Sequence, residues 1–178
     1  MTATALTPVR VRIERHTILP GSAARVFDWL ADIPTSVRCF PQVMSCDPLP
    51  DPHTGTNAGW RVGMQPRQVA LVRVVTIYAC AYSVDRTSGI VRWQPLAPHW
   101  APDANARMSG CWSLELAKPC ASANGQPGLA ARLEIDGEIG LPLPALATTL
   151  AAPLVQGEFS HMADAYVQRV RQALAATG

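Results

Sequence analysis

Charged and aromatic residues are scarce in this 178-residue chain: Asp, Glu, Lys and Arg make up 16%, and Phe, Trp and Tyr 6%. An average soluble domain carries about 25% charged residues. The 15 basic and 13 acidic side chains leave a net charge of +2 and are spread along the chain. We therefore expect no nucleic-acid partner, since such proteins concentrate basic residues. The 48% hydrophobic content also excludes a disordered chain.

Motifs for most kinds of site chemistry are missing as well. The five cysteines form no C-x-x-C pair and the four histidines are scattered, so we expect no metal site and no cofactor. There is no G-x-S-x-G motif for a nucleophile and no glycine loop for a phosphate. The N-terminal residues MTATALTPVRVR lack the apolar core of a secretory signal. This predicts a reducing, cytoplasmic location.

One uncharged stretch, residues 139–157, approaches the length of a membrane span. It contains Pro142, Pro144 and Pro153, which would break the backbone hydrogen bonding that lipid demands. We expect a buried connector here. Peripheral contact with a membrane surface stays open as an alternative.

The pattern of apolar residues predicts one α+β domain over residues 1–178, with a core of about 9–176. A first strand is followed by two short helices, at 23–31 and from 34 to about 40, the first capped by Ser22. Alternation and β-branched content predict the first strand and six more, at 9–18, 42–49, 58–64, 68–85, 90–96, 107–117 and 129–139. Apolar residues recur every three to four positions over 153–176, which predicts a long C-terminal helix. The sheet should curve around this helix, whose apolar face is the largest available.

At this point the chain resembles the Bet v 1-like superfamily, also called SRPBCC or START-like, over about residues 9–175. The first helix reads P-x-S-A-x-x-V-F-x-W-L-A-D at 20–32, much as polyketide cyclase and dehydrase-like members begin. The strand pair 108–116 and 129–139 and the proline-broken entry to the last helix also match. The ending, 139–174, is similar to the DUF1997 branch. The resemblance implies a helix-grip fold, in which a curved antiparallel sheet of about seven strands wraps the helix.

What the resemblance implies for function is a cavity between sheet and helix that binds an apolar small molecule. Lipids, isoprenoids, pigments and polyketides all fit this description, and the protein would act as a carrier or sensor. An alternative is a cyclase, aromatase or dehydratase, which needs an acid and a base inside the cavity. A second alternative is a protein-interaction domain with a closed core and an exposed apolar patch around 141–154. The superfamily shares no catalytic motif, so no catalytic residue is assigned. The sequence specifies neither the ligand nor the oligomeric state.

Candidate ligand-binding residues come from the predicted core and from one end of the sheet. Three tryptophans lie on predicted strands and three residues on the helix stripe, where core packing is the alternative role. These six candidates are Trp60, Trp93, Trp112, Phe159, Met162 and Tyr166. Successive turns of a meander alternate between its two ends, so the connector after Met64, the loop 97–106 and the connector 140–152 should share one end. We predict the cavity entrance at this end, near His99 and Trp100.

Arg73 is a further candidate, because it interrupts the most apolar strand and a buried guanidinium is costly unless paired. Three orientations stay open. The side chain faces solvent, or it points inward and anchors a polar atom of the ligand, or it forms an internal ion pair with an acid such as Glu134. His99 could serve as a general base only if substrate reaches it, and loop histidines are mostly solvated.

Overall fold

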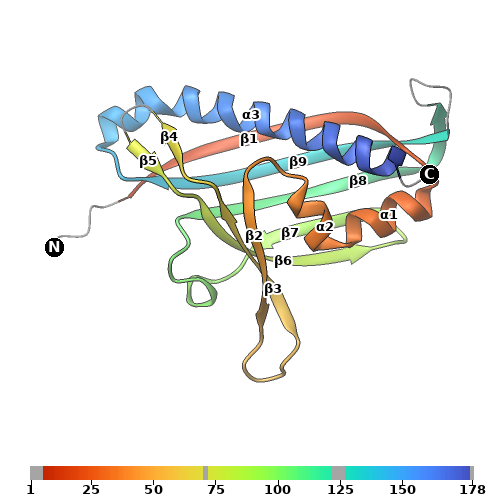
Figure 1. Ribbon diagram of the computed structural model, residues 1–178, viewed down its shortest axis with the longest axis horizontal. Coiled ribbons are helices and arrows are strands. Elements are labelled where there is room, and N and C mark those ends of the chain that lie inside the picture. The colour runs from red at the N-terminus through yellow and green to blue at the C-terminus, as the bar shows by residue number, and fades with distance from the viewer. Residues whose placement is uncertain (1–5, 70–71, 122–126, 177–178) are drawn as a thin grey trace.

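A curved sheet of seven antiparallel strands carries one long helix across its concave face in the computed structural model (Figure 1). The structure describes residues 6–69, 72–121 and 127–176. The strands of the main sheet follow the order β1-β9-β8-β7-β6-β3-β2. Their bounds are β1 Thr7–Pro20, β2 Val43–Pro50, β3 Asn57–Met64, β6 Ile77–Asp85, β7 Ile90–Pro95, β8 Ala106–Ala121 and β9 Pro127–Leu141. This arrangement confirms the predicted helix-grip α+β fold.

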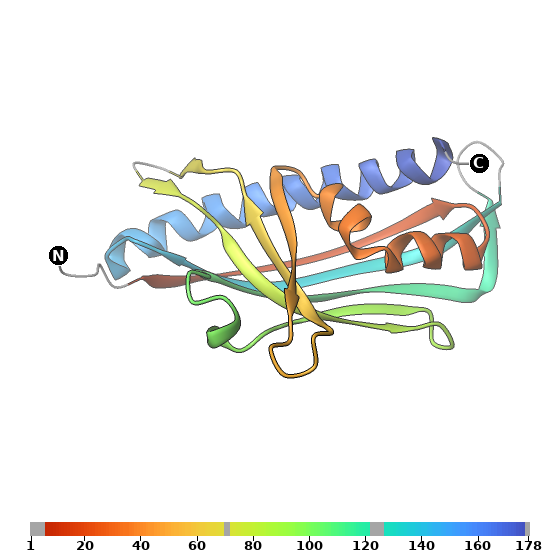
Figure 2. The same ribbon diagram turned by 60° about the horizontal axis from the view of Figure 1, so that its bottom comes forward.

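Helices cover only one face of the sheet. Two short helices, α1 (Ala23–Ala31) and α2 (Ile33–Arg38), follow β1 as expected, and Ser22 caps α1 by accepting from the backbone N–H of Arg25. The C-terminal helix α3 (Ala145–Ala176) is about 48 Å long at 1.5 Å per residue. Figure 2 shows the sheet curving beneath α3, with α1 and α2 filling the space beside it. A single turn of 3₁₀ helix, η1 (Pro98–Trp100), lies in the loop before β8.

Polar contacts fix α3 along β1, an edge strand of the sheet. The side-chain amide of Gln156 accepts from the backbone N–H of Arg12 at 3.0 Å and donates to its carbonyl at 2.8 Å. These two bonds use backbone groups that an edge strand otherwise leaves to water or to another chain. One turn further along, Arg15 forms an ion pair with Asp164 and a hydrogen bond to Ser160. The middle of the helix therefore has a defined position over the sheet.

The predicted single strand over 68–85 is wrong. Three strands occupy this region: β4 (Arg67–Val69) and β5 (Val72–Val74) form a separate two-stranded sheet, and only β6 belongs to the main sheet. The chain leaves the main sheet after Met64, whose N–H donates to the carbonyl of Thr76 and so closes the excursion. Arg67 then forms an ion pair with Glu158 of α3. The β-branched residues favour a strand at each of these positions. They could not reveal that β4 and β5 belong to a separate sheet, because all three segments are strands.

The predicted start of the last helix is also wrong, by eight residues. The helix begins at Ala145, where the N–H of Thr148 donates to the carbonyl of Pro144, and Pro153 lies inside it. Alanine and leucine are strong helix formers, and their propensity outweighs the one hydrogen bond that Pro153 cannot donate. The expected buried connector at 139–157 is therefore mostly helix. Its side chains are not all buried, since Leu150 is 80% and Leu154 60% exposed.

Glycine at the centre of the concave face sets how closely side chains can lie on the sheet. Trp93, Gly110 and Ile135 are direct partners on β7, β8 and β9, so they share one face. A Cβ added to Gly110 would overlap the Trp93 ring and the carbonyl oxygen of Glu134. A Cβ added to Gly157 in α3, in contrast, would meet no atom within 4 Å.

We predict opposite effects for two Gly→Ala substitutions. Gly110→Ala should lower the free energy of unfolding by about 1–3 kcal/mol, because the core there is already filled. Gly157→Ala should raise it by up to about 1 kcal/mol through helix propensity. Urea unfolding of both variants measures the difference. Equal effects would contradict the close packing of Trp93 on the sheet.

Candidate functional site

A cavity lies between the sheet, α2 and α3, at the place where a ligand was expected. Its volume is about 50 Å³. The walls come from all layers of the fold, and seven of the fifteen lining residues are aromatic. They are Leu30, Ile33, Ser36, Val37, Phe40, Met64, Tyr78, Tyr82, Val91, Trp93, Met108, Trp112, Ile135, Phe159 and Tyr166. No lining residue carries a charge, although the fold brings strands from most of the chain to this point.

Tyr166 is the polar centre of the cavity wall. Its hydroxyl lies 2.9 Å from the hydroxyl of Ser36 on α2 and accepts a hydrogen bond of 3.1 Å from Nε1 of Trp112 on β8. All three side chains are buried. The ring of Tyr166 also contacts Phe40, with 5.2 Å between the ring centroids. A single hydroxyl thus connects α3, α2 and the sheet.

The other two tyrosines of the chain line the same cavity. Tyr78 and Tyr82 lie four residues apart on β6, so both point to the concave face. Neither hydroxyl forms a hydrogen bond with a described residue, and the ring of Tyr82 stacks on Trp93 at 6.1 Å. Burial raises the pKa of both phenols well above the ordinary value. They therefore stay protonated near neutral pH and offer O–H donors to the cavity.

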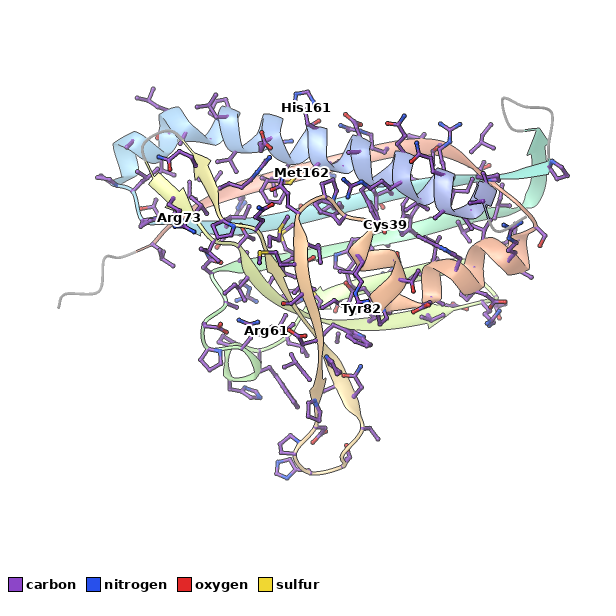
Figure 3. All side chains as sticks on the ribbon, viewed as in Figure 1. Cys39, Arg61, Arg73, Tyr82, His161 and Met162 are labelled. Carbon is purple, nitrogen blue, oxygen red and sulfur yellow. The ribbon has the colours of Figure 1, made fainter. Side chains whose placement is uncertain are left out.

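Four of the nine predicted site residues line this cavity: Trp93, Trp112, Phe159 and Tyr166. Met162 is buried on α3, and Trp60 packs against the core from β3, but the cavity surface includes neither. Figure 3 shows Met162 and Tyr82 on opposite sides of the space between helix and sheet.

The remaining three predicted residues lie away from the cavity. His99 is exposed and Trp100 half-buried in η1, where their rings contact each other at 5.5 Å. Arg73 is exposed on β5, so of its three open orientations the structure shows the one toward solvent (Figure 3). An internal pair with Glu134 does not form, because Glu134 pairs with Arg132. The detour of the chain into β4 and β5 carries Arg73 out of the main sheet.

Sequence reasoning missed several cavity residues, notably Ser36, Phe40, Met64, Tyr78 and Met108. The two methionines were inside segments correctly predicted as strands, and Tyr78 was in the part of the predicted strand 68–85 that is β6. The alternation of these segments could have indicated an inward direction. Ser36 and Phe40 carry no such signal. Their place depends on how α2 packs against α3, which is a tertiary contact.

A second hollow, of about 610 Å³, opens beside the cavity between the end of β3, β4 and α3. We call it the glutamine groove. Its lining residues are Gln42, Gln65, Pro66, Arg67, Gln68, Leu154 and Glu158. Residues 65–67 belong to the end of the sheet where the entrance was predicted. Loop 97–106 and the start of the last connector reach the same end, since the Gly140 N–H donates to the carbonyl of Asn105 and the Asn105 amide donates to Val75.

Exposed hydrophobic residues also occur at this end of the molecule, where Figure 1 shows the start of α3 next to the start of β1 and to β5. Four of the seven large hydrophobic residues that are exposed in the described part of the chain lie here: Leu6, Val75, Leu150 and Leu154. Arg73 lies nearby and forms no ion pair with a described residue. None of the described helices combines the length and apolar character needed to cross a bilayer. Within the described ranges no group of three or more His, Cys, Asp or Glu could hold a metal ion.

Solved structures with the same architecture are numerous. A START superfamily protein from Mycobacterium smegmatis has a TM-score of 0.62 at 12% identity, covering 94% of this chain and 99% of its own. The Zhui aromatase/cyclase from Streptomyces sp. R1128 gives 0.61 at 13% identity, covering 93% and 94%. This chain has the START-like helix-grip fold. A STAR-related lipid transfer protein from Xanthomonas axonopodis shares this fold, with a TM-score of 0.58 at 18% identity over 92% of this chain and 85% of its own.

Sequence comparisons add nothing to this START-like assignment. No protein-family model and no curated protein matches the chain. The narrower resemblance to the DUF1997 branch is not confirmed.

We predict that the Tyr166 hydroxyl stabilises the fold more than the Tyr78 hydroxyl does. Tyr166→Phe leaves the buried Nε1–H of Trp112 without its acceptor and should cost about 1–3 kcal/mol of unfolding free energy. Tyr78→Phe removes a hydroxyl that bonds no described residue and should cost less than about 0.5 kcal/mol. Urea titrations of the two variants test this. Equal losses would show that the hydrogen bonds to Ser36 and Trp112 contribute little.

Proposed function

We propose that this protein binds an uncharged apolar small molecule in the cavity between α3 and the sheet, as a carrier or sensor. The observation that carries the proposal is the lining: seven aromatic residues, three of them tyrosines, and no charged one. Burial of apolar ligand surface would drive binding, at about 25 cal/mol per Å². Two structures of the same fold, a lipid transfer protein and an aromatase/cyclase by their names, support an apolar ligand.

Binding is favoured over catalysis by the chemistry of the cavity wall. A cyclase or dehydratase acting by general acid–base catalysis needs a base whose pKa lies near the working pH. The lining residues include no Asp, Glu, His, Lys or Arg. Desolvation raises the pKa of Tyr166, as it does for Tyr78 and Tyr82, which makes these phenols donors and poor bases.

The cavity of about 50 Å³ has room for one or two water molecules, so a larger ligand must push lining side chains apart. Met64 and Met108 suit this role, since unbranched thioether side chains repack at small cost. The helix α2, which contributes Ser36 and Val37, is the shortest of the three helices in the wall. The structure is thus the closed form of the proposed binding protein.

Native mass spectrometry of gently purified protein, followed by organic extraction, tests the proposal directly. We expect an added mass that extraction releases. In parallel, the neutral fluorophore N-phenyl-1-naphthylamine should bind with one-to-one stoichiometry. Val37→Phe, which fills the cavity from α2, should weaken this binding about tenfold. Val167→Phe is the matched control, because Val167 is equally half-buried but outside the cavity lining, and it should change affinity less than about twofold.

Two results would argue against a ligand-binding cavity. One is bare protein that also fails to bind the fluorophore. The other is equal weakening by the two phenylalanine substitutions. Either would favour the closed-core interaction domain.

The exposed hydrophobic end is proposed as the surface through which the protein contacts anionic membranes. The first thirteen residues of α3, 145–157, carry no charge, and Leu150 and Leu154 lie one turn apart on its exposed side. Arg73 supplies an exposed cation at the same end, which complements an anionic headgroup. Leu154 also lines the glutamine groove. A ligand leaving the bilayer would therefore meet the groove first.

We predict that Leu150→Glu with Leu154→Glu abolishes co-sedimentation with vesicles of phosphatidylglycerol and phosphatidylcholine. Each leucine should contribute about 1.5–3 kcal/mol when it leaves water. Val84→Glu is the matched control: Val84 is 46% exposed near the opposite end of β6, and its variant should bind vesicles like the wild type. Arg73→Gln should weaken binding to the anionic vesicles alone. Vesicle binding that survives the double substitution would overturn the proposal.

A further inference from the structure

Two unusual features of the described chain coincide at Gln42. It is the only non-glycine residue in the described ranges with a positive φ, 67°. Such backbone strain persists where the surrounding structure imposes it, and it clusters at ligand sites. The side-chain Oε1 of Gln42 is also buried without a hydrogen-bond partner among the described residues. A buried amide oxygen without a donor costs about 1–3 kcal/mol, so its retention calls for an explanation.

Gln42 lines the glutamine groove, whose lining comes from three chain segments that also contribute to the cavity wall. Each wall of the groove continues a wall of the cavity within two residues along the chain. Gln42 follows Phe40, Gln65 follows Met64, and Glu158 precedes Phe159. The Gln65 N–H donates to the Gln42 carbonyl at 2.7 Å, which holds the first two walls together. A ligand that fills the cavity and extends past Phe40, Met64 and Phe159 therefore reaches the polar side chains of this groove.

The groove is polar but carries no net charge. Its only charged residues, Arg67 and Glu158, form an ion pair with each other. The other polar side chains are the amides of Gln42, Gln65 and Gln68. An anionic head group would have to compete with Glu158 for the guanidinium of Arg67. A neutral hydroxyl can donate to the free Oε1 of Gln42 and accept from neighbouring N–H groups at once.

We propose that the glutamine groove binds the neutral, hydroxyl-bearing head of an amphiphile whose apolar body occupies the cavity. The inference rests on the proposed function and deepens it from an apolar molecule to a class of amphiphile. Gln42 is the residue that recognises the head, through a hydrogen bond from a ligand hydroxyl to its Oε1. Arg67 and Glu158 keep the groove electrically neutral and thereby select against carboxylate heads.

Three probes of equal chain length test the head group: 1-decanoylglycerol, methyl decanoate and decanoate. Their binding can be followed by the fluorescence of Trp93 and Trp112, which line the cavity. We expect wild-type affinity in the order decanoylglycerol, methyl decanoate, decanoate. The first two differ in hydroxyl donors, so their ratio isolates the head-group contact.

Gln42→Gly removes the acceptor and at the same time relieves the positive φ, so this variant should fold at least as stably as wild type. It should lose about tenfold affinity for decanoylglycerol and less than about twofold for methyl decanoate. Gln94→Ala, an exposed amide on β7, is the control and should change neither. Glu158→Gln frees the charge of Arg67 and should raise affinity for decanoate about tenfold.

The possible failures are distinguishable. If none of the three probes binds, the proposed cavity function fails and the head-group inference with it. Suppose instead that the ratio of the affinities for decanoylglycerol and methyl decanoate is the same in wild type and in Gln42→Gly. The cavity function then stands and the head-group inference is overturned. The same holds if Glu158→Gln leaves the preference against decanoate unchanged.

Discussion

A single helix must cover a sheet that is much wider than itself, and the remaining features of the molecule follow from this mismatch. Seven strands at about 4.8 Å spacing span roughly 30 Å, whereas a helix with its side chains is about 10 Å across. Helix α3 lies along β1, so the concave face of β6, β7 and β8 is left to other groups. Helices α1 and α2 cover part of it, and large aromatic side chains fill the rest. The cavity lies between these helices and aromatic side chains.

Different contacts hold helix α3 on its two sides. On the β1 side, Gln156 and Arg15 make polar contacts with fixed geometry. On the cavity side, the helix is held by the hydrogen bonds of Tyr166 and the ion pair of Glu158 with Arg67. Expansion of the cavity toward α2 and β4 would therefore have to break the Tyr166–Ser36 hydrogen bond or the Arg67–Glu158 ion pair. The glutamine groove lies on this side of α3, and Leu154 also lines it.

The chemistry of the cavity matches the low charge of the whole chain. An uncharged lining keeps a carboxylate or ammonium out, because burying an unpaired ion costs several kcal/mol. The tyrosine hydroxyls add polarity without charge, since burial keeps them protonated. Recognition of the proposed ligand would then depend on shape, apolar area and a few hydrogen bonds. The lining of the groove adds two charged groups, Arg67 and Glu158, which neutralise each other.

The order of elements, the seven strands, the capped first helix and the apolar stripe of α3 follow from local patterns, because alternation and a period near 3.6 residues report which face is buried. The stripe put Phe159 and Tyr166 on the inward face of the helix, strand alternation did the same for Trp93 and Trp112, and all four line the cavity. Local patterns could not reveal that residues 67–74 leave the main sheet, nor that α3 starts at Ala145, since both depend on contacts between distant segments such as Arg67 with Glu158. The meeting of Ser36, Tyr166 and Trp112, and the burial of the Gln42 Oε1 atom, were decided by the tertiary structure alone. Each joins elements more than fifty residues apart or depends on a backbone conformation that no sequence period encodes.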